Sequence, residues 1–252
     1  MARFIGAVIM AAFALSLAGS ARAADDKDAK AVLDKAIKAL GGEEKLAKVK
    51  GYTAKAKGKL SFGDTDNEFT SETTVQGIDH FRNEFEGEFG GNKVKGVVIL
   101  AGDKGWRQFG DDKMDMDKDA IANEKRNAYL QAVPVTLLPL KDKAFKIESA
   151  KEDKVDGKPA DAIKVTGPDG KDFTLYFDKE SNLPVKASAK VVGFMGDEAV
   201  QETTFSDYKE TGGIKKAMKV KVTRGGAKFL EQQITDFKIL DKADDKAFTE
   251  PK

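Results

Sequence analysis

Two kinds of hydrophobic pattern divide the chain. Near the N-terminus, after the polar run Asp25-Asp26-Lys27-Asp28, apolar residues recur at helical spacing up to Gly41-Gly42. They are Val32, Leu33, Ala36, Ile37 and Leu40. This spacing predicts one amphipathic helix, which the glycine pair ends. A shorter helical turn is expected from Glu43 to Val49, leading into a region where the period changes from helical to two.

A first block of strands is predicted from Gly51 onward. Apolar positions Tyr52, Ala54, Ala56, Leu60 and Phe62 alternate with polar ones, as in a strand with one buried and one solvated face. The following runs repeat this alternation around Phe69 and Val75, and then around Phe81, Phe85 and Phe89. Turn residues separate the runs at Gly63-Asp64, Gly77, Gly90-Gly91 and Gly102-Asp103. Such spacing favours consecutive antiparallel hairpins over βαβ units.

The strand pattern is interrupted once, between about Asp117 and Lys141. Apolar residues there are cut by Pro134 and Pro139. Because proline breaks a helix but is tolerated in a first turn, we expect one helix up to Val133 and a short helical or irregular piece after Pro134. The result is a helical insertion within a sheet. It is either a hinged lid, the preferred interpretation, or a fixed layer over one sheet face.

Strands resume after the insertion. The turns between them are of chain-reversing types, such as Asp156-Gly157, Gly212-Gly213 and Gly225-Gly226. The whole chain therefore predicts a mainly β (α+β) protein with about eleven strands. With no linker or low-complexity stretch, residues 24–252 are expected to form a single domain. The later strands are expected at 145–152, 160–165, 172–177, 184–192, 199–208, 216–224 and 228–240.

The first 23 residues have the features of a cleaved secretory signal. Arg3 precedes an apolar stretch from Phe4 to Leu17, and Ala21-Arg22-Ala23 provides small residues for cleavage. The apolar stretch is shorter than the roughly 20 residues that a retained membrane span needs. We therefore expect a soluble, exported protein of the periplasm, with no membrane anchor after cleavage.

Composition narrows the possible partners. Removing Arg3 and Arg22 changes 43 basic against 42 acidic residues to 41 against 42, so the mature chain is nearly neutral. A neutral chain has no general electrostatic reason to bind nucleic acid or anionic membranes. The absence of cysteine excludes disulfides, thiolate metal sites, cysteine nucleophiles and a lipid-modified cysteine.

The candidate catalytic and metal motifs are weak. His80 is the only histidine, and no oriented nucleophile or partner accompanies it. Asp115, Asp117 and Asp119 have the first offsets of a calcium loop, but Ala120 and Arg126 stand where glycine and glutamate are required. An acidic helix start explains them better. Ser206-Asp207-Tyr208-Lys209 fits S-x-x-K without the other segments of penicillin-recognising enzymes. We expect no enzyme activity, no cofactor and no metal.

The order of elements carries a family resemblance. The cues are turn and strand phrases of the second half: Val155-Asp156-Gly157-Lys158-Pro159, Phe173 to Asp178, Asn182 before Leu183-Pro184-Val185, and Phe205 to Tyr208 before Gly212-Gly213-Ile214. With a helix, a block of strands, a helical insertion and a second block, the chain resembles the LolA-like superfamily, which includes periplasmic outer-membrane lipoprotein-sorting proteins. The resemblance implies an unclosed half-barrel and a lipoprotein carrier-like function. It transfers no catalytic residue, and no receptor-contacting motif of the family can be matched.

A strongly curved, unclosed sheet offers more concave apolar surface than its own side chains fill, which favours a ligand pocket. The alternative for every candidate lining residue is ordinary core packing. Two functions are favoured: a carrier or chaperone for a lipid or lipoprotein acyl chains, and a protein-binding or envelope-sensing module that pairs through an exposed strand edge. A hydrolase, the third alternative, is disfavoured because the usual nucleophilic motifs are missing and only carboxylates could act. Lys216, Lys219 and Lys221 on one late strand indicate a charged edge, which disfavours the protein-binding module. The candidate pocket residues are Phe62, Phe69, Phe81, Phe85, Phe89, Trp106, Leu130, Val133 and Leu137.

Overall fold

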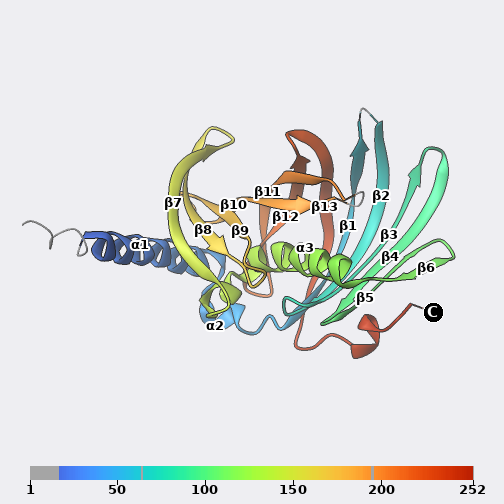
Figure 1. The fold of residues 1–252 in the computed structure, drawn as a ribbon, viewed down its shortest axis with the longest axis horizontal. Helices are drawn as coiled ribbons and strands as arrows, with labels where there is room; N and C mark the ends of the chain where they lie inside the picture. Colours follow the sequence, from blue (N-terminus) through green and yellow to red (C-terminus); the bar gives the residue numbers. More distant parts are fainter. Residues whose placement is uncertain (1–16, 64, 194–195, 252) are drawn as a thin grey trace, which may run out of the picture.

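One antiparallel sheet dominates the molecule. The computed structural model describes residues 17–63, 65–193 and 196–251, with side chains described from Asp28 onward. Thirteen strands follow the order β6-β5-β4-β3-β2-β1-β13-β12-β11-β10-β9-β8-β7 and curl into an unclosed half-barrel (Figure 1). The strands are β1 Gly51–Phe62, β2 Thr65–Gln76, β3 His80–Phe89, β4 Asn92–Ala101, β5 Lys104–Phe109, β6 Asp112–Asp115, β7 Lys146–Val155, β8 Lys158–Thr166, β9 Asp172–Asp178, β10 Pro184–Val192, β11 Glu198–Thr211, β12 Ile214–Arg224 and β13 Ala227–Leu240.

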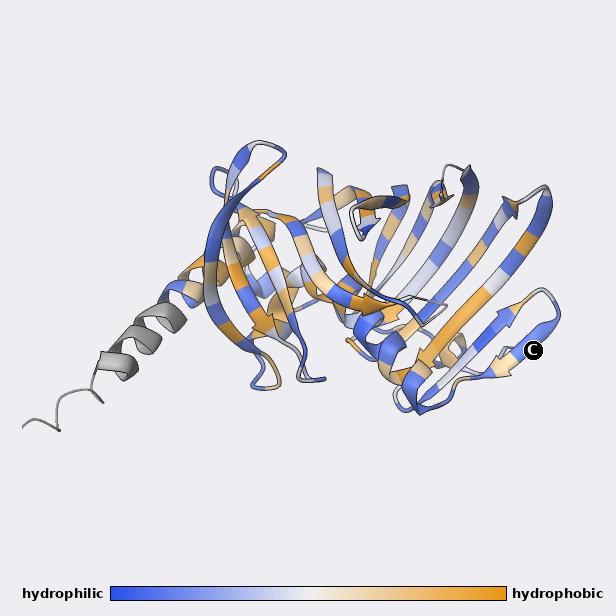
Figure 2. Ribbon diagram, turned by 45° about the horizontal axis from the view of Figure 1, so that its top comes forward, coloured by the Kyte–Doolittle hydropathy of each residue, from blue (hydrophilic) through white to orange (hydrophobic). Residues whose placement is uncertain are grey.

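The predicted fold class is confirmed, and so is the meander of hairpins. Hydrophobic and hydrophilic positions alternate along most strands (Figure 2), as the period of two predicts. The strand count was wrong: thirteen replace about eleven, because β5 and β6 were not expected. Both are short, and every residue of β6 is exposed, so β6 lacks the apolar alternation by which the other strands were found.

The helices lie at defined places on the sheet. The first, α1 (Leu17–Leu40), packs on β7, β8 and β12, and the predicted short turn is α2 (Glu43–Leu46). The predicted signal segment overlaps the start of α1, and residues 1–16 lie outside the described part. The inserted α3 (Lys118–Thr136) crosses the concave side of the sheet (Figure 1) and contacts β4 on one side and β10 on the other.

The principal core lies where α1 and α3 meet the inner face of the sheet. Ala29, Leu33, Ala36, Ile37 and Leu40 form one buried face of α1, as the helical spacing predicted. A second, smaller cluster lies on the opposite face of the sheet. It forms where the 3₁₀ helix η2 (Asp245–Phe248) covers β3 and β4, and it contains Val97, Ile99, Ala243 and Phe248.

The end of the insertion differs from expectation at one point. The helix was expected to stop at Val133, but α3 continues to Thr136 with Pro134 inside its last turn. Proline so near the C-terminal end removes one hydrogen bond and leaves little helix to disrupt. Leu137 then takes a left-handed conformation with φ of 60° and ends the helix. The expected short piece follows as the 3₁₀ helix η1 (Leu138–Lys141), with Pro139 in its first turn.

The interpretation of the lysines on β12 as an edge feature was wrong. Strand β12 pairs with β11 on one side and β13 on the other, so it lies in the interior of the sheet. The two true edges are β6 and β7. Among the described helices, none combines the length and the apolar character that crossing a membrane requires.

Candidate functional site: an apolar cavity under helix α3

A cavity of about 330 Å³ lies between α3 and the concave face of the sheet. Strands of both halves of the half-barrel and one face of α3 contribute to its wall. The apolar wall residues are Tyr52, Ala54, Ala56, Phe69, Phe81, Val98, Leu130, Ala187, Ala189, Phe205, Val220, Val222, Phe229, Leu230 and Ile234. The polar ones are Ser71, Thr73, Asn83, Glu124, Asn127, Gln131, Gln201, Thr203, Lys216, Arg224 and Gln232.

Strand register explains why these residues face one another. Ala54 pairs with Thr73 and Phe237, while Thr203 pairs with Ala187 and Val222. Paired residues of neighbouring antiparallel strands lie on the same face. Short side chains therefore meet in the middle of the concave face, as at Ala56, Ser71 and Ala187. Because short side chains cannot span the space below α3, a cavity remains.

The predicted pocket residues divide into four groups. Phe69, Phe81 and Leu130 line the cavity. Val133 and Leu137 are fully buried in the principal core. Trp106 pairs with Ile99 and packs with the second cluster, on the face of the sheet away from the cavity. The remaining three are Phe62, Phe85 and Phe89. By strand alternation their side chains belong to the concave face, but they lie nearer the hairpin tips than the cavity does.

These three phenylalanines form a connected row with Phe109, which we call the phenylalanine rim. Ring centroids are 6.2 Å apart for Phe62 and Phe89, 6.4 Å for Phe85 and Phe89, and 6.1 Å for Phe85 and Phe109. The ring of Phe85 lies over Gly96, where a Cβ would come within 2.5 Å of it. Phe62 is 57% exposed. The rim thus extends the apolar surface of the concave face toward solvent.

Sequence reasoning missed the charged residues of the cavity. On β12, Lys216 has the same phase as Ile214, Met218, Val220 and Val222, and it lines the cavity with Arg224. A lysine in the apolar phase of a strand was the signal that could have identified it. Burial alone lowers the pKa of Lys216 to about 8.

Lys216 and Arg224 have different surroundings. The Nζ of Lys216 lies 5.6 Å from the ring centroid of Phe237 and donates to the carbonyl oxygen of Ala217 at 3.2 Å. The guanidinium of Arg224 lies 3.7 Å above the ring of Phe229, and its Nε donates to Gln201 Oε1 at 3.0 Å. Within the part of the chain that the structure describes, neither residue forms an ion pair with a carboxylate.

A buried network fixes α3 to the second half of the sheet. Arg126, 3% exposed, binds Asp169 Oδ2 at 2.9 Å and donates to the carbonyl oxygens of Lys190 at 2.9 Å and Asp172 at 2.8 Å. The Tyr129 hydroxyl donates to Asp169 Oδ1 at 2.8 Å. Burial, and then the hydrogen bond to Asp169, raise the pKa of Tyr129. A buried network of several hydrogen bonds holds the helix in one position.

Other contacts fix α3 to the first half of the sheet. Glu124 binds Arg107 of β5 at 3.2 Å, and Lys125 binds Asp103 at 2.5 Å. Burial raises the pKa of Glu124, and the nearby Arg107 opposes that effect. The N-terminus of α3 is capped by Asp117, whose carboxylate accepts from the Ala120 amide at 2.8 Å, which confirms the acidic helix start. Helix α3 therefore crosses the concave side and is attached to both halves of the sheet.

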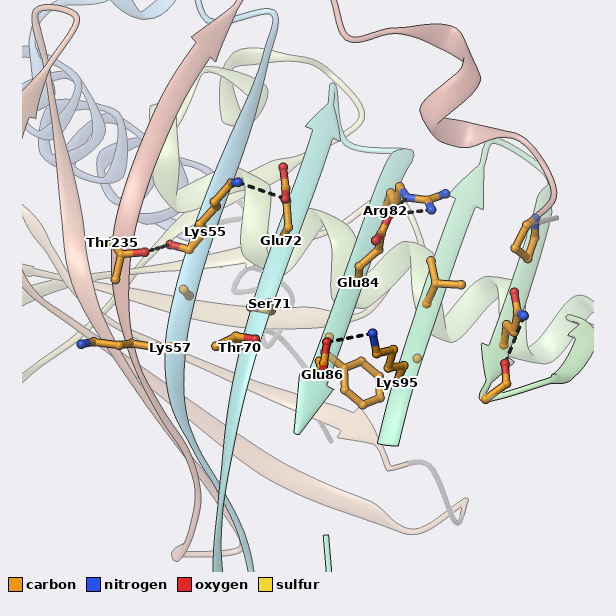
Figure 3. Close-up of a pocket in the computed structure, with 17 residues that line it drawn as sticks. Lys55, Lys57, Thr70, Ser71, Glu72, Arg82, Glu84, Glu86, Lys95 and Thr235 are labelled. Carbon is orange, nitrogen blue, oxygen red and sulfur yellow. Dashed lines mark hydrogen bonds and ion pairs between the residues drawn. The ribbon is translucent and has the colours of Figure 1, made fainter. Parts of the chain in front are cut away.

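A larger groove of about 740 Å³ lies on the convex face, and Figure 3 shows it. Seven of its seventeen lining residues are charged, and six of these bind each other in pairs. Lys55 lies 3.4 Å from Glu72, Arg82 lies 2.6 Å from Glu84, and Lys95 lies 3.1 Å from Glu86 (Figure 3). Because these charges satisfy one another in solvent, the groove has the character of an ordinary solvated sheet face.

The remaining motifs have structural explanations. His80 begins β3, its Nδ1 lies 2.9 Å from Asp79, and its ring packs edge-on against Phe248 at 5.3 Å. The Ser206 to Lys209 segment lies within β11 rather than at a helix start. Among the described residues, no group of three or more histidine, cysteine or acidic side chains is placed to hold a metal ion.

Comparison with solved structures identifies the fold. A LolA superfamily protein from Nitrosomonas europaea superposes with a TM-score of 0.59 at 11% identity, over 88% of this chain and 97% of that one. A domain from Vibrio parahaemolyticus described as an outer membrane lipoprotein-sorting protein gives 0.52 at 13% identity, over 86% and 97%. A DUF1329 family protein from Desulfovibrio piger gives 0.53 at 14% identity, over 88% and 97%.

Comparison by sequence adds no relative. No family model matches the chain, and no curated protein matches it. The resemblance noted in the sequence is thus confirmed at the level of the fold, which is that of the LolA superfamily. At 11–14% identity the likeness concerns the fold alone.

Proposed function

We propose that this chain is an exported carrier, acting in the periplasm as a single domain of residues 24–252, that shelters an acyl chain beneath α3. The observation that carries the proposal is the apolar cavity on the concave face, continued by the phenylalanine rim toward solvent. Small-molecule sites are typically apolar cavities with a few placed polar groups. The signal-like segment at residues 1–23 supports export.

The energy of burying an acyl chain is sufficient for such a role. Transfer of each methylene from water into an apolar site contributes about 0.8 kcal/mol, so a dozen contribute roughly 10 kcal/mol before the cost of ordering the chain. The cavity of about 330 Å³ is at the small end of ligand sites, which span about 300–1,000 Å³. This size favours one acyl chain over the several chains of a lipidated protein terminus.

The attachment of α3 on both sides suggests how a ligand enters. Opening the helix would break the buried contacts of Arg126 or the Glu124–Arg107 pair. The hairpin tips present the exposed Phe62 and the phenylalanine rim without such contacts. We therefore expect entry along the rim, with α3 as a fixed cover rather than a hinged lid.

The rival function, protein binding through a strand edge, has less support. Strand β7 is one edge, but it carries six charged residues in the run Lys146–Val155 and has a register irregularity between Ala150 and Asp153. Charges and bulges are features that natural edges use to avoid pairing with other chains. The other edge, β6, spans only Asp112–Asp115.

Two measurements test the carrier proposal. Organic extracts of protein purified from a periplasm without detergent are analysed by mass spectrometry, and delipidated protein is titrated with a fluorescent fatty-acyl probe. We expect a lipid near one per protein and saturable probe binding. Clean protein that refuses the probe would contradict the proposal, and one protein partner recovered in fixed stoichiometry without lipid would favour the rival.

A pair of variants locates the binding site. Thr203→Phe places a ring in the cavity, while Thr204→Phe places the same ring on the opposite face of β11. We expect Thr203→Phe to weaken probe binding at least tenfold and Thr204→Phe to leave it unchanged. Equal effects of the two variants, with folding intact by circular dichroism, would place the probe elsewhere.

A further inference from the structure

The charge distribution of the cavity carries a further inference. Of the three ionisable wall residues besides Tyr52, only Glu124 is acidic, and its carboxylate is bound by Arg107 at 3.2 Å. Arg224 forms no ion pair with a carboxylate among the described residues, although Asp197 attracts it electrostatically. Lys216 has neither contact within that part of the chain, so it is the uncompensated positive charge of the wall. A charge withdrawn from water is costly unless it is paired.

The partial contacts of Lys216 leave its ammonium group incompletely satisfied. An ammonium group has three donors, and the structure gives it one acceptor, the Ala217 carbonyl oxygen. The Phe237 ring offers a weak additional attraction at 5.6 Å. Lys219, three residues later on the opposite face of β12, is paired with Glu231 at 2.8 Å. The sheet thus supplies a carboxylate to the lysine in solvent and none to the lysine in the cavity.

The position of Lys216 orients a ligand. Lys216 lies over the ring of Phe237, which packs against Tyr52 in the principal core, so Lys216 marks the inner end of the cavity. Arg224 precedes the Gly225-Gly226 turn at the other end of β12, about 26 Å away at roughly 3.3 Å per residue. A ligand with its anionic group at Lys216 would extend its apolar part toward the hairpin tips.

We propose that the cavity binds a single-chain anionic amphiphile whose charged head pairs with Lys216 and whose acyl chain runs toward the phenylalanine rim. This inference rests on the proposed carrier function and specifies its ligand class. A fatty-acid carboxylate and a monoacyl phosphate share the required chemistry. Both supply the anion that the cavity lacks, and both have the single chain that its volume favours.

The test compares three ligands that share one C16 chain and differ in their head group. Full-length protein, isolated from the periplasm and delipidated, is titrated with a C16 fatty acid, the C16 alcohol and a C16 monoacyl phosphate. We expect at least one anion to bind about 10- to 100-fold more tightly than the alcohol, as a charge-assisted hydrogen bond to a buried group implies. Whichever of the carboxylate and the phosphate binds more tightly identifies the preferred anionic head group.

Variants of one strand attribute the preference to Lys216. In Lys216→Met we expect the anion preference to disappear while the alcohol binds as before. Lys216→Arg, which keeps the charge, should retain a preference, and Lys219→Met should behave as wild type because its side chain is on the other face. Thermal unfolding of each variant verifies that it is folded, and Lys216→Gln replaces any methionine variant that is not.

The outcomes separate this inference from the carrier proposal. If acid, phosphate and alcohol bind wild type equally well, the anion site is wrong and the carrier function stands. If a folded Lys216→Met loses alcohol and anion alike, Lys216 only shapes the cavity. If no C16 compound binds wild type, both proposals fail.

Discussion

The two faces of the sheet hold their charged groups in opposite ways. On the convex face, charged side chains are numerous, exposed and paired with one another, as Lys55–Glu72 and Lys95–Glu86 illustrate. On the concave side they are few: Glu124 and Arg126 are buried, and Lys216 and Arg224 are half-buried. There, Arg126 and Glu124 fix α3 in place, while Lys216 has no acidic partner among the described residues. The convex groove is larger but less suited to specific ligand binding, because solvent screens the interactions of its exposed charges.

The largest effect is expected from the buried arginine. Arg126→Ala removes every contact of the guanidinium and leaves Asp169 Oδ2 and two carbonyl oxygens without this donor, while Tyr129 still donates to Asp169 Oδ1. We expect a loss of about 3–5 kcal/mol in the free energy of unfolding, measured by urea denaturation. Lys125→Ala, the neighbouring residue with an exposed ion pair, is the control and should cost less than about 1 kcal/mol. Similar losses for the two would remove the distinction between buried and exposed charged contacts.

A pH-dependent effect of intermediate size is expected from Lys216. The pKa of Lys216 is about 8 in the folded chain and 10.5 in the unfolded chain. Between pH 8 and 10.5 the unfolded chain therefore binds more protons than the folded chain, so stability rises with pH. We expect the wild-type chain to gain on the order of 1–3 kcal/mol from pH 8 to 10.5 relative to Lys216→Met. The comparison cancels the contributions of Tyr52, Glu124, Arg224 and the Lys209–Asp207 pair, which both proteins retain. A difference independent of pH would contradict the assignment.

A smaller effect is expected at the start of α3. Asp117→Ala removes the side-chain acceptor of the Ala120 amide. Loss of such a cap costs about 1 kcal/mol, and Asp117→Asn should restore most of it because the amide oxygen can accept the same bond. Denaturation curves of the three proteins measure the difference. An asparagine variant as unstable as the alanine variant would mean that the charge, not the hydrogen bond, matters.

The smallest effect is expected on the convex face. Lys95→Ala breaks the exposed pair with Glu86 shown in Figure 3. An exposed pair contributes about 0–1 kcal/mol, so we expect a change within about 0.5 kcal/mol that diminishes further in high salt. Acyl-probe affinity should not change. A large loss of either stability or affinity would show that the convex groove is more than a solvated face.

The sequence by itself determined the order of elements. Alternating runs, together with the turns between them, indicated every strand except β5 and β6, and Asp117 signalled the start of α3. The same reasoning found Phe69, Phe81 and Leu130, which line the cavity. It could not find β6, whose four residues are all exposed and lack a buried phase.

Only the tertiary structure decided which face of the sheet each of the two alternating sets of strand residues occupies. Period two sorts residues into two sets without saying which set faces α3, and here both faces have apolar cover. The C-terminal η2 packs on the convex side, so Trp106 joins Ile99 and Phe248 there instead of lining the cavity. The sequence does not give strand order, so it could not show that the pairing of β12 with β11 and β13 places Lys216 inside the sheet. Strand order and curvature arise from contacts between distant segments, and no local pattern encodes them.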